Sequence, residues 1–163
     1  MTKLPITNGT LFAYVMNNCW FTNYKAGQDG RFEFRYRLTS DEAIDRATAA
    51  RFGESAVQPL RAIRLRPGPE KGDLPATKSF CRVEPASVQL TAVKVADDGR
   101  GIIVRLRETT GKPTTATLSS SFLGVREAVR CDLVERNQIP LPMTGGQVTL
   151  ELAPEGMATI RFR

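Results

Sequence analysis

The alternation of apolar and polar residues predicts a chain built mainly of β-strands. Residues 31–38 alternate without a break, with Phe32, Phe34 and Tyr36 on one side and charged residues on the other. A period of two is typical of a strand with one buried face and one solvated face. The preceding residues 11–24 are rich in aromatic and apolar side chains, and they predict a buried strand that runs into an Asn-rich bend.

Short strands are also predicted along the rest of the chain. They follow one another at intervals of about 8–12 residues with turn signals between them, which is typical of a β-sandwich. Asp97-Asp98-Gly99 marks a strong turn between two of them. The predicted strands span residues 58–66, 87–95, 102–107, 114–118, 129–134, 147–152 and 157–162.

One helix is predicted after the alternating segment. Thr39 and Glu42 have the spacing of a capping box, and Asp41 and Glu42 place negative charge in the first turn. Gly53 predicts the C-terminal end of the helix. The helix is short and rich in alanine, so we expect it to connect two parts of the chain and to lie against a sheet.

A Pro- and Gly-rich stretch at residues 67–78 predicts a linker or exposed loop. Proline lacks the backbone donor that a strand ladder needs, and glycine is costly to order. We therefore expect a boundary here, with residues 1–66 on one side and a small β-sandwich of residues 79–163 on the other.

Composition narrows the class of protein. With 163 residues, 41% hydrophobic and 25% charged, the chain is typical of a globular protein. The net charge of +6 is carried largely by arginines that are spread along the predicted strands, and their densest cluster, Arg61, Arg64 and Arg66, has no interleaved aromatic residues. This pattern disfavours nucleic-acid binding and favours a solvated or partner-facing surface. The apolar runs are too short to predict a membrane span.

Cysteine and histidine usage limits the chemistry. Cys19, Cys81 and Cys131 are odd in number and far apart, which predicts reduced thiols and a cytoplasmic location. Without histidine or a Cys-x-x-Cys pair, the sequence disfavours a zinc site and excludes histidine bases within this chain. The adjacent acids Asp97 and Asp98 predict a tight turn rather than a catalytic carboxylate pair.

Several motifs resemble one family. Residues 17–23 are similar to the Asn-Asn-x-Trp-x-Thr-Asn segment in the C-terminal β region of glycoside hydrolase family 38, the retaining α-mannosidases. Residues 105–111 resemble the Arg-Leu-x-Glu-x-x-Gly strand and turn of that family. Residues 133–135 and 157–162 are also similar, so the resemblance covers nearly the whole chain in collinear order.

The resemblance implies an all-β fold and a non-catalytic role. Residues 1–66 would be trailing strands of a galactose-mutarotase-like supersandwich plus the short helix, and residues 79–163 a small terminal β-sandwich. The zinc-binding catalytic domain would lie upstream and be a partner, which leaves no cofactor in this chain. Accessory sugar-binding residues would come from the Asn-rich bend, namely Asn17, Asn18, Trp20, Asn23 and Tyr24.

Other interpretations stay open. The Asn-rich bend can equally build a tight turn around a core tryptophan. A free-standing carbohydrate-binding β-sandwich is the alternative function, and it would require Trp20 and Tyr24 to form an exposed platform. A basic nucleic-acid-binding β domain is disfavoured by the arginine pattern. Since a truncated sheet would leave an unpaired edge and an uncovered aromatic face, we expect a homo-oligomer joined through the N-terminal half.

Overall fold

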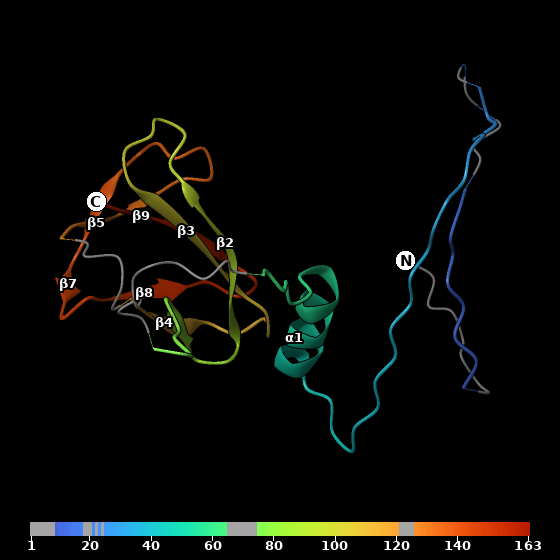
Figure 1. The fold of residues 1–163 in the computed structure, drawn as a ribbon, viewed down its shortest axis with the longest axis horizontal. Coiled ribbons are helices and arrows are strands. Elements are labelled where there is room, and N and C mark those ends of the chain that lie inside the picture. The colour runs from blue at the N-terminus through green and yellow to red at the C-terminus, as the bar shows by residue number, and fades with distance from the viewer. Residues whose placement is uncertain (1–8, 18–20, 22, 24, 65–74, 121–125) are drawn as a thin grey trace. The chain divides into compact units, whose positions relative to one another are not determined.

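The computed structural model describes residues 9–17, 21, 23, 25–64, 75–120 and 126–163 of the chain. The chain divides into two units, residues 1–39 and residues 40–163. Among the described residues, the helix and all the strands belong to the second unit (Figure 1). The first unit consists of extended segments and turns.

The second unit contains a β-sandwich of two antiparallel sheets (Figure 1). In the described residues one sheet has the strand order β1-β4-β8-β7, and the other has the order β2-β3-β9-β5-β6. The strands are β1 (Arg82–Glu84), β2 (Val88–Val95), β3 (Ile102–Glu108), β4 (Thr114–Ser119), β5 (Ala128–Cys131), β6 (Ile139–Leu141), β7 (Met143–Thr144), β8 (Gln147–Leu152) and β9 (Met157–Phe162). This architecture confirms the predicted all-β sandwich fold.

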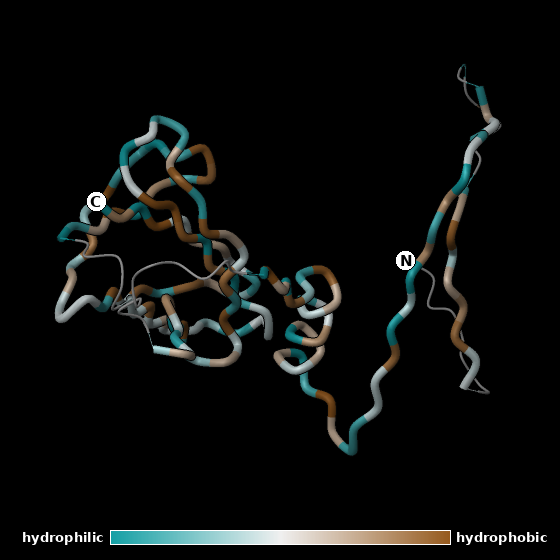
Figure 2. Tube along the Cα trace, in the orientation of Figure 1, coloured by the Kyte–Doolittle hydropathy of each residue, from teal (hydrophilic) through white to brown (hydrophobic). Residues whose placement is uncertain are grey.

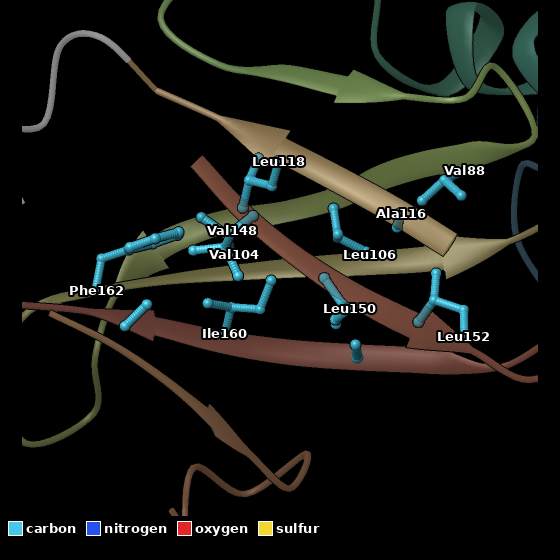
Figure 3. Packing of buried hydrophobic residues seen from close by; sticks show 12 residues of the cluster. Val88, Val104, Leu106, Ala116, Leu118, Val148, Leu150, Leu152, Ile160 and Phe162 are labelled. Carbon is cyan, nitrogen blue, oxygen red and sulfur yellow. The ribbon is translucent and has the colours of Figure 1, made fainter. Parts of the chain in front are cut away.

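The inner faces of the two sheets enclose an apolar core (Figure 3). In one sheet Val104 of β3 is the register partner of Ile160 of β9, and in the other Leu118 of β4 is the partner of Val148 of β8. All four side chains are fully buried. Register partners in an antiparallel pair point to the same face, so each sheet presents a continuous apolar surface to the other.

Five predicted strands agree closely with β2, β3, β4, β8 and β9, since alternation is a strong signal where one face is buried. The prediction for residues 129–134 was wrong at its end, because β5 stops at Cys131. The Asp132 carboxylate accepts hydrogen bonds from the backbone N–H groups of Val134 and Arg136, which turns the chain. The short strands β1, β6 and β7 were not predicted.

The predicted helix boundaries were wrong. Helix α1 spans Arg46–Val57 and begins after Asp45, whose carboxylate accepts a hydrogen bond from Thr48 N at 2.7 Å. Asp is a stronger N-cap than Thr, so the helix begins after Asp45 and not after Thr39, where the capping-box pattern had predicted it. The helix also continues through Gly53, at a cost of about 1 kcal/mol relative to alanine.

Two segments predicted as strands form none in the structure. Residues 31–38 and the described residues 58–64 are not paired in a sheet, and residues 31–38 run as an extended segment (Figure 1). Phe32, Phe34 and Tyr36 keep 49%, 46% and 60% of their surface exposed, and Figure 2 shows hydrophobic residues along this extended part of the chain. Alternation predicts which face of a strand is apolar, but the ladder needs a neighbouring strand, and the sequence does not say where that neighbour comes from.

The domain boundaries at residues 66 and 79 stay a prediction, since residues 65–74 lie outside the described part of the chain. The same holds for the supersandwich assigned to residues 1–66. Of the cysteines, Cys131 is buried, Cys81 is half-buried, and both are free thiols. Cys19 lies outside the described residues.

Leu118→Ala tests the core. We expect it to lower the free energy of unfolding by about 2–5 kcal/mol, because it removes a fully buried side chain and leaves a cavity between the sheets. Val95→Ala is the matched control, since Val95 is 66% exposed and its truncation should change stability by less than about 0.5 kcal/mol. Urea unfolding measures both variants. Equal losses of unfolding free energy in Leu118→Ala and Val95→Ala would contradict the placement of Leu118 in the core.

Candidate functional site

The outer face of the five-stranded sheet is unusually well covered. Alternation along β9 places Thr159 and Arg161 on the face opposite the core, yet they are only 1% and 3% exposed. The turns at residues 96–101 and 132–137 supply Asp98 and Glu135, whose carboxylates accept hydrogen bonds from Arg161. Ala96, Ile103 and Cys131 form a small apolar cluster on this side.

Charged side chains meet beneath these turns. Arg161 Nη1 lies 2.7 Å from Asp98 Oδ2, and Arg161 Nη2 lies 3.4 Å from Glu135 Oε2. Lys94 Nζ lies 2.6 Å from Glu135 Oε1 and also pairs with Asp97. We call these five residues the outer-face ion network.

Glu135 joins the two turns. Besides its ion pairs, its Oε2 accepts a hydrogen bond from the backbone N–H of Asp97 at 2.8 Å. Its own backbone has a φ of 65°, a left-handed conformation that is uncommon for residues other than glycine. Within this turn the backbone N–H of Glu135 donates to Asp132 O at 3.0 Å, and the backbone N–H of Arg136 donates to Asp132 Oδ1 at 2.8 Å.

The network keeps its carboxylates ionised. The hydrogen bond from Lys94 lowers the pKa values of Glu135 and Asp97, and the pKa of Asp98 is lowered by the backbone N–H of Arg100 and then by Arg161. A general acid of a glycosidase needs a raised pKa. The network is therefore suited to fixing turns rather than to donating protons, and the prediction of a tight turn at Asp97-Asp98 is confirmed by the hydrogen bond from Gly99 N to Ala96 O.

A second buried carboxylate organises the opposite end of β3. Glu108 is 0% exposed and accepts hydrogen bonds from the backbone N–H groups of Thr110, Gly111 and Glu155 at 2.7–3.0 Å, and from the Thr110 hydroxyl. Burial raises the pKa of the Glu108 carboxyl, but these hydrogen bonds outweigh burial and lower it to about 2. Glu108 thus holds the turn after β3 against the turn before β9.

Helix α1 is attached at this same place. Arg46 Nη2 lies 2.7 Å from Glu155 Oε1, and Arg46 Nη1 donates to Thr110 O at 3.1 Å. Gly111 leaves room for the guanidinium, since a Cβ there would lie 2.7 Å from Arg46 Nη1. Only Ala47 of α1 is buried, so the helix is positioned by this arginine more than by an apolar face.

The residues predicted to bind sugar are only partly described. Asn17 and Asn23 are exposed, whereas Asn18, Trp20 and Tyr24 lie outside the described residues. The described residues hold no group of three or more His, Cys, Asp or Glu side chains placed to bind a metal. Within the same part of the chain, no helix is long and apolar enough to cross a membrane.

Sequence reasoning did not foresee the roles of Glu108, Glu135, Arg161 and Arg46. Three of them, Glu108, Glu135 and Arg161, fall within the motifs that carry the family resemblance. The Glu-x-x-Gly spacing of residues 108–111 is the spacing of the hydrogen bond from Gly111 N to Glu108 Oε2, at 2.7 Å. Glu135 ends the motif at residues 133–135, in which Leu133 O accepts a hydrogen bond from Arg105. These motif residues hold turns in the structure. Their place in the motifs was the sequence signal that could have identified them.

Comparison with known proteins agrees with this geometry. Residues 87–160 match the model of the glycosyl hydrolases family 38 C-terminal beta sandwich domain. The matched range begins beside β2 and ends within β9, so it includes the buried carboxylates Glu108 and Glu135, whereas Arg161 lies one residue beyond it. No curated protein sequence matches the chain.

Glu108→Gln tests the buried carboxylate through pH. Because its pKa falls from an ordinary value of 4.5 to about 2 on folding, ionised Glu108 contributes stability that is complete above pH 4.5 and is lost as the pH falls toward 2. We expect the variant to have a lower Tm at pH 7 and a shallower decline of Tm between these pH values. Glu151→Gln, on the exposed face of β8, is the control and should keep the wild-type profile. Parallel profiles for wild type and Glu108→Gln would contradict the role of Glu108.

Proposed function

We propose that the chain is the non-catalytic C-terminal β region of an α-mannosidase-like glycoside hydrolase, because residues 87–160 match the model of the glycosyl hydrolases family 38 C-terminal beta sandwich domain. In this proposal the chain packs on a catalytic domain that it does not contain. The observation that carries the proposal is the match of the sandwich to this domain.

The buried carboxylates of the sandwich support a structural role for this domain. Among the described residues the buried carboxylates are Glu108 and Glu135, and both have lowered pKa values and are held by backbone N–H groups or cations. Such groups fix turns and remain ionised at neutral pH. Their arrangement favours a scaffold over an acid–base site.

Zinc does not fit the donor set of this chain. Catalytic zinc sites use histidine, carboxylate and cysteine ligands, and the sequence has no histidine. In the proposal, any zinc belongs to the catalytic domain, and this chain contributes accessory contacts to the sugar pocket from the Asn-rich bend. Asn17, Asn18, Trp20, Asn23 and Tyr24 are the proposed accessory residues, since amides can pair with hydroxyl groups and aromatic rings can stack on a pyranose.

We also propose a cytoplasmic location, supported by the free thiols of Cys81 and Cys131. The extended residues 31–38 support a partner for the N-terminal half, because their aromatic side chains are about half exposed. A sheet edge supplied by the catalytic part of the enzyme, or by a second copy of the chain, would cover them. The alternative of a free-standing carbohydrate-binding module requires the platform of Trp20 and Tyr24.

Complementation tests the proposed function. We expect the purified chain alone to leave an aryl α-mannoside intact, with or without zinc, and to restore hydrolysis when mixed with a family 38 catalytic fragment that lacks its C-terminal β region. Trp20→Ala should lower kcat/KM of the mixture about tenfold, the equivalent of one lost stacking or hydrogen-bonding contact. Phe12→Ala is the control, since Phe12 is 79% exposed and lies outside the bend. Zinc-dependent turnover by the chain alone would overturn the proposal.

Light scattering tests the association of the N-terminal half. We expect the chain to be a dimer or larger at tens of micromolar, since burying each large aromatic side chain contributes about 1.5–3 kcal/mol. The double variant Phe34→Ser/Tyr36→Ser should have a lower mass, whereas Val95→Ser, on an exposed position of the sandwich, should not. A monodisperse wild-type monomer would show that the N-terminal half needs no second copy.

A further inference from the structure

The four-stranded sheet has a hollow of about 340 Å³ at one end. Its lining comes from the residues that lead into β1, from the end of β4, and from the turn between β7 and β8. Ligand pockets in proteins measure about 300–1,000 Å³, so this hollow has the size for one small ring.

Polar side chains of three adjacent strands form one row in the hollow. Arg82 of β1 is the register partner of Ser119 of β4, and Ser119 is the partner of Gln147 of β8. Partners in antiparallel strands point to the same face and lie about 4.5–5.5 Å apart. The next residues along these strands, Leu118 and Val148, are in the core, so the row lies on the outer face of the sheet.

The row combines donors and acceptors without a free charge. Arg82 Nη2 and Nε lie 2.7 Å and 3.1 Å from Glu84 Oε1, so the guanidinium is paired with a carboxylate at the protein surface and keeps other N–H groups to donate. Gln147 offers an amide that both donates and accepts, and Ser119 offers a hydroxyl. This chemistry suits a neutral ligand with several hydroxyl groups better than an anion.

An aromatic side chain completes the hollow. Phe80 lines it and is 49% exposed. Its backbone is fixed, because Phe80 O accepts a hydrogen bond from the Ser120 hydroxyl at 2.9 Å and Cys81 O accepts one from the Ser79 hydroxyl at the same distance. Pre-positioned groups lose less entropy when a ligand binds.

The turn between β7 and β8 closes one side. Gly145 and Gly146 have φ values of 57° and 76°, as a two-residue type I′ hairpin requires. The turn lies close to the end of β4, since Ser120 N donates to Gly146 O at 3.2 Å and a Cβ on Gly146 would lie 3.2 Å from Ser120 O. The hollow is therefore bounded by backbone that is held in place.

We propose that this hollow binds a single neutral pyranose, with Gln147, Ser119 and Arg82 pairing with its hydroxyl groups and Phe80 contacting its apolar face. The site is separate from the Asn-rich bend and does not require the catalytic partner. It would give the sandwich a sugar contact of its own, in addition to the proposed scaffold role.

A titration of the ¹⁵N-labelled 163-residue chain with methyl α-mannoside tests this site by NMR. We expect saturable shifts of the Gln147 side-chain amide and of the backbone amides of Ser119, Gly145 and Gly146, with a Kd on the order of 1 mM for a ligand of this size. Sodium phosphate at the same concentrations should not produce them. An unshifted spectrum at tens of millimolar mannoside, or shifts caused by phosphate instead, would overturn the proposal.

Variants decide which groups carry binding. Gln147→Ala and Phe80→Ala should each weaken binding at least about tenfold. Gln138→Ala is the matched control, because Gln138 is an exposed glutamine that precedes β6 of the other sheet. Equal affinity in wild type, Gln147→Ala and Gln138→Ala would reject the assigned residues. The result is independent of complementation, so failure of one proposal does not imply failure of the other.

Discussion

Burial of both faces of β9 is the constraint on which the rest of the sandwich depends. This strand pairs with β3 on one side and β5 on the other, so its backbone is satisfied within the sheet. Ile160 points into the core, and Arg161, next to it, is almost as deeply buried on the opposite face. A buried guanidinium needs partners in place of water, and Asp98 and Glu135 pair with the two Nη groups of Arg161, while its Nε has no hydrogen-bond partner among the described residues. The positions of the two covering turns follow from that requirement.

At the opposite end of β3 the buried charge is an anion, the carboxylate of Glu108. Among the described residues Glu108, at the end of β3, forms no ion pair, and backbone N–H groups of two turns stabilise its charge. The same turns then present Thr110 O and Glu155 to Arg46, which positions α1. Polar contacts thus fix the helix that leads into the sandwich, where an apolar helix face would do so in many other domains.

The sandwich and the N-terminal half of the chain differ in how they use charged and apolar side chains. The sandwich uses its buried charges to hold its own turns, while the N-terminal half keeps many apolar side chains exposed. The sandwich buries its apolar residues in its own core, whereas Phe32, Phe34 and Tyr36 of the N-terminal half stay about half exposed. The hollow beside Phe80 lies on the scaffold itself, where a ligand could bind without any change in the core.

The sequence by itself determined the five long strands of the sandwich, because alternation and Gly- or Asp-rich turns are local signals. The motifs that resemble glycoside hydrolase family 38 include Glu108 and Glu135, but that their carboxylates hold turns was visible only in the structure. Only the tertiary structure decided that Arg161 is buried, since alternation places it on the solvent side and the covering turns come from distant parts of the chain. The helix starts after Asp45 rather than Thr39, because Asp45 caps it. Residues 31–38 form no strand, because no neighbouring strand pairs with them in the described residues. The burial of Arg161 and the unpaired segment at residues 31–38 thus depend on contacts from outside the local pattern, whereas the helix start depends on the local hydrogen bond from Thr48 N to Asp45.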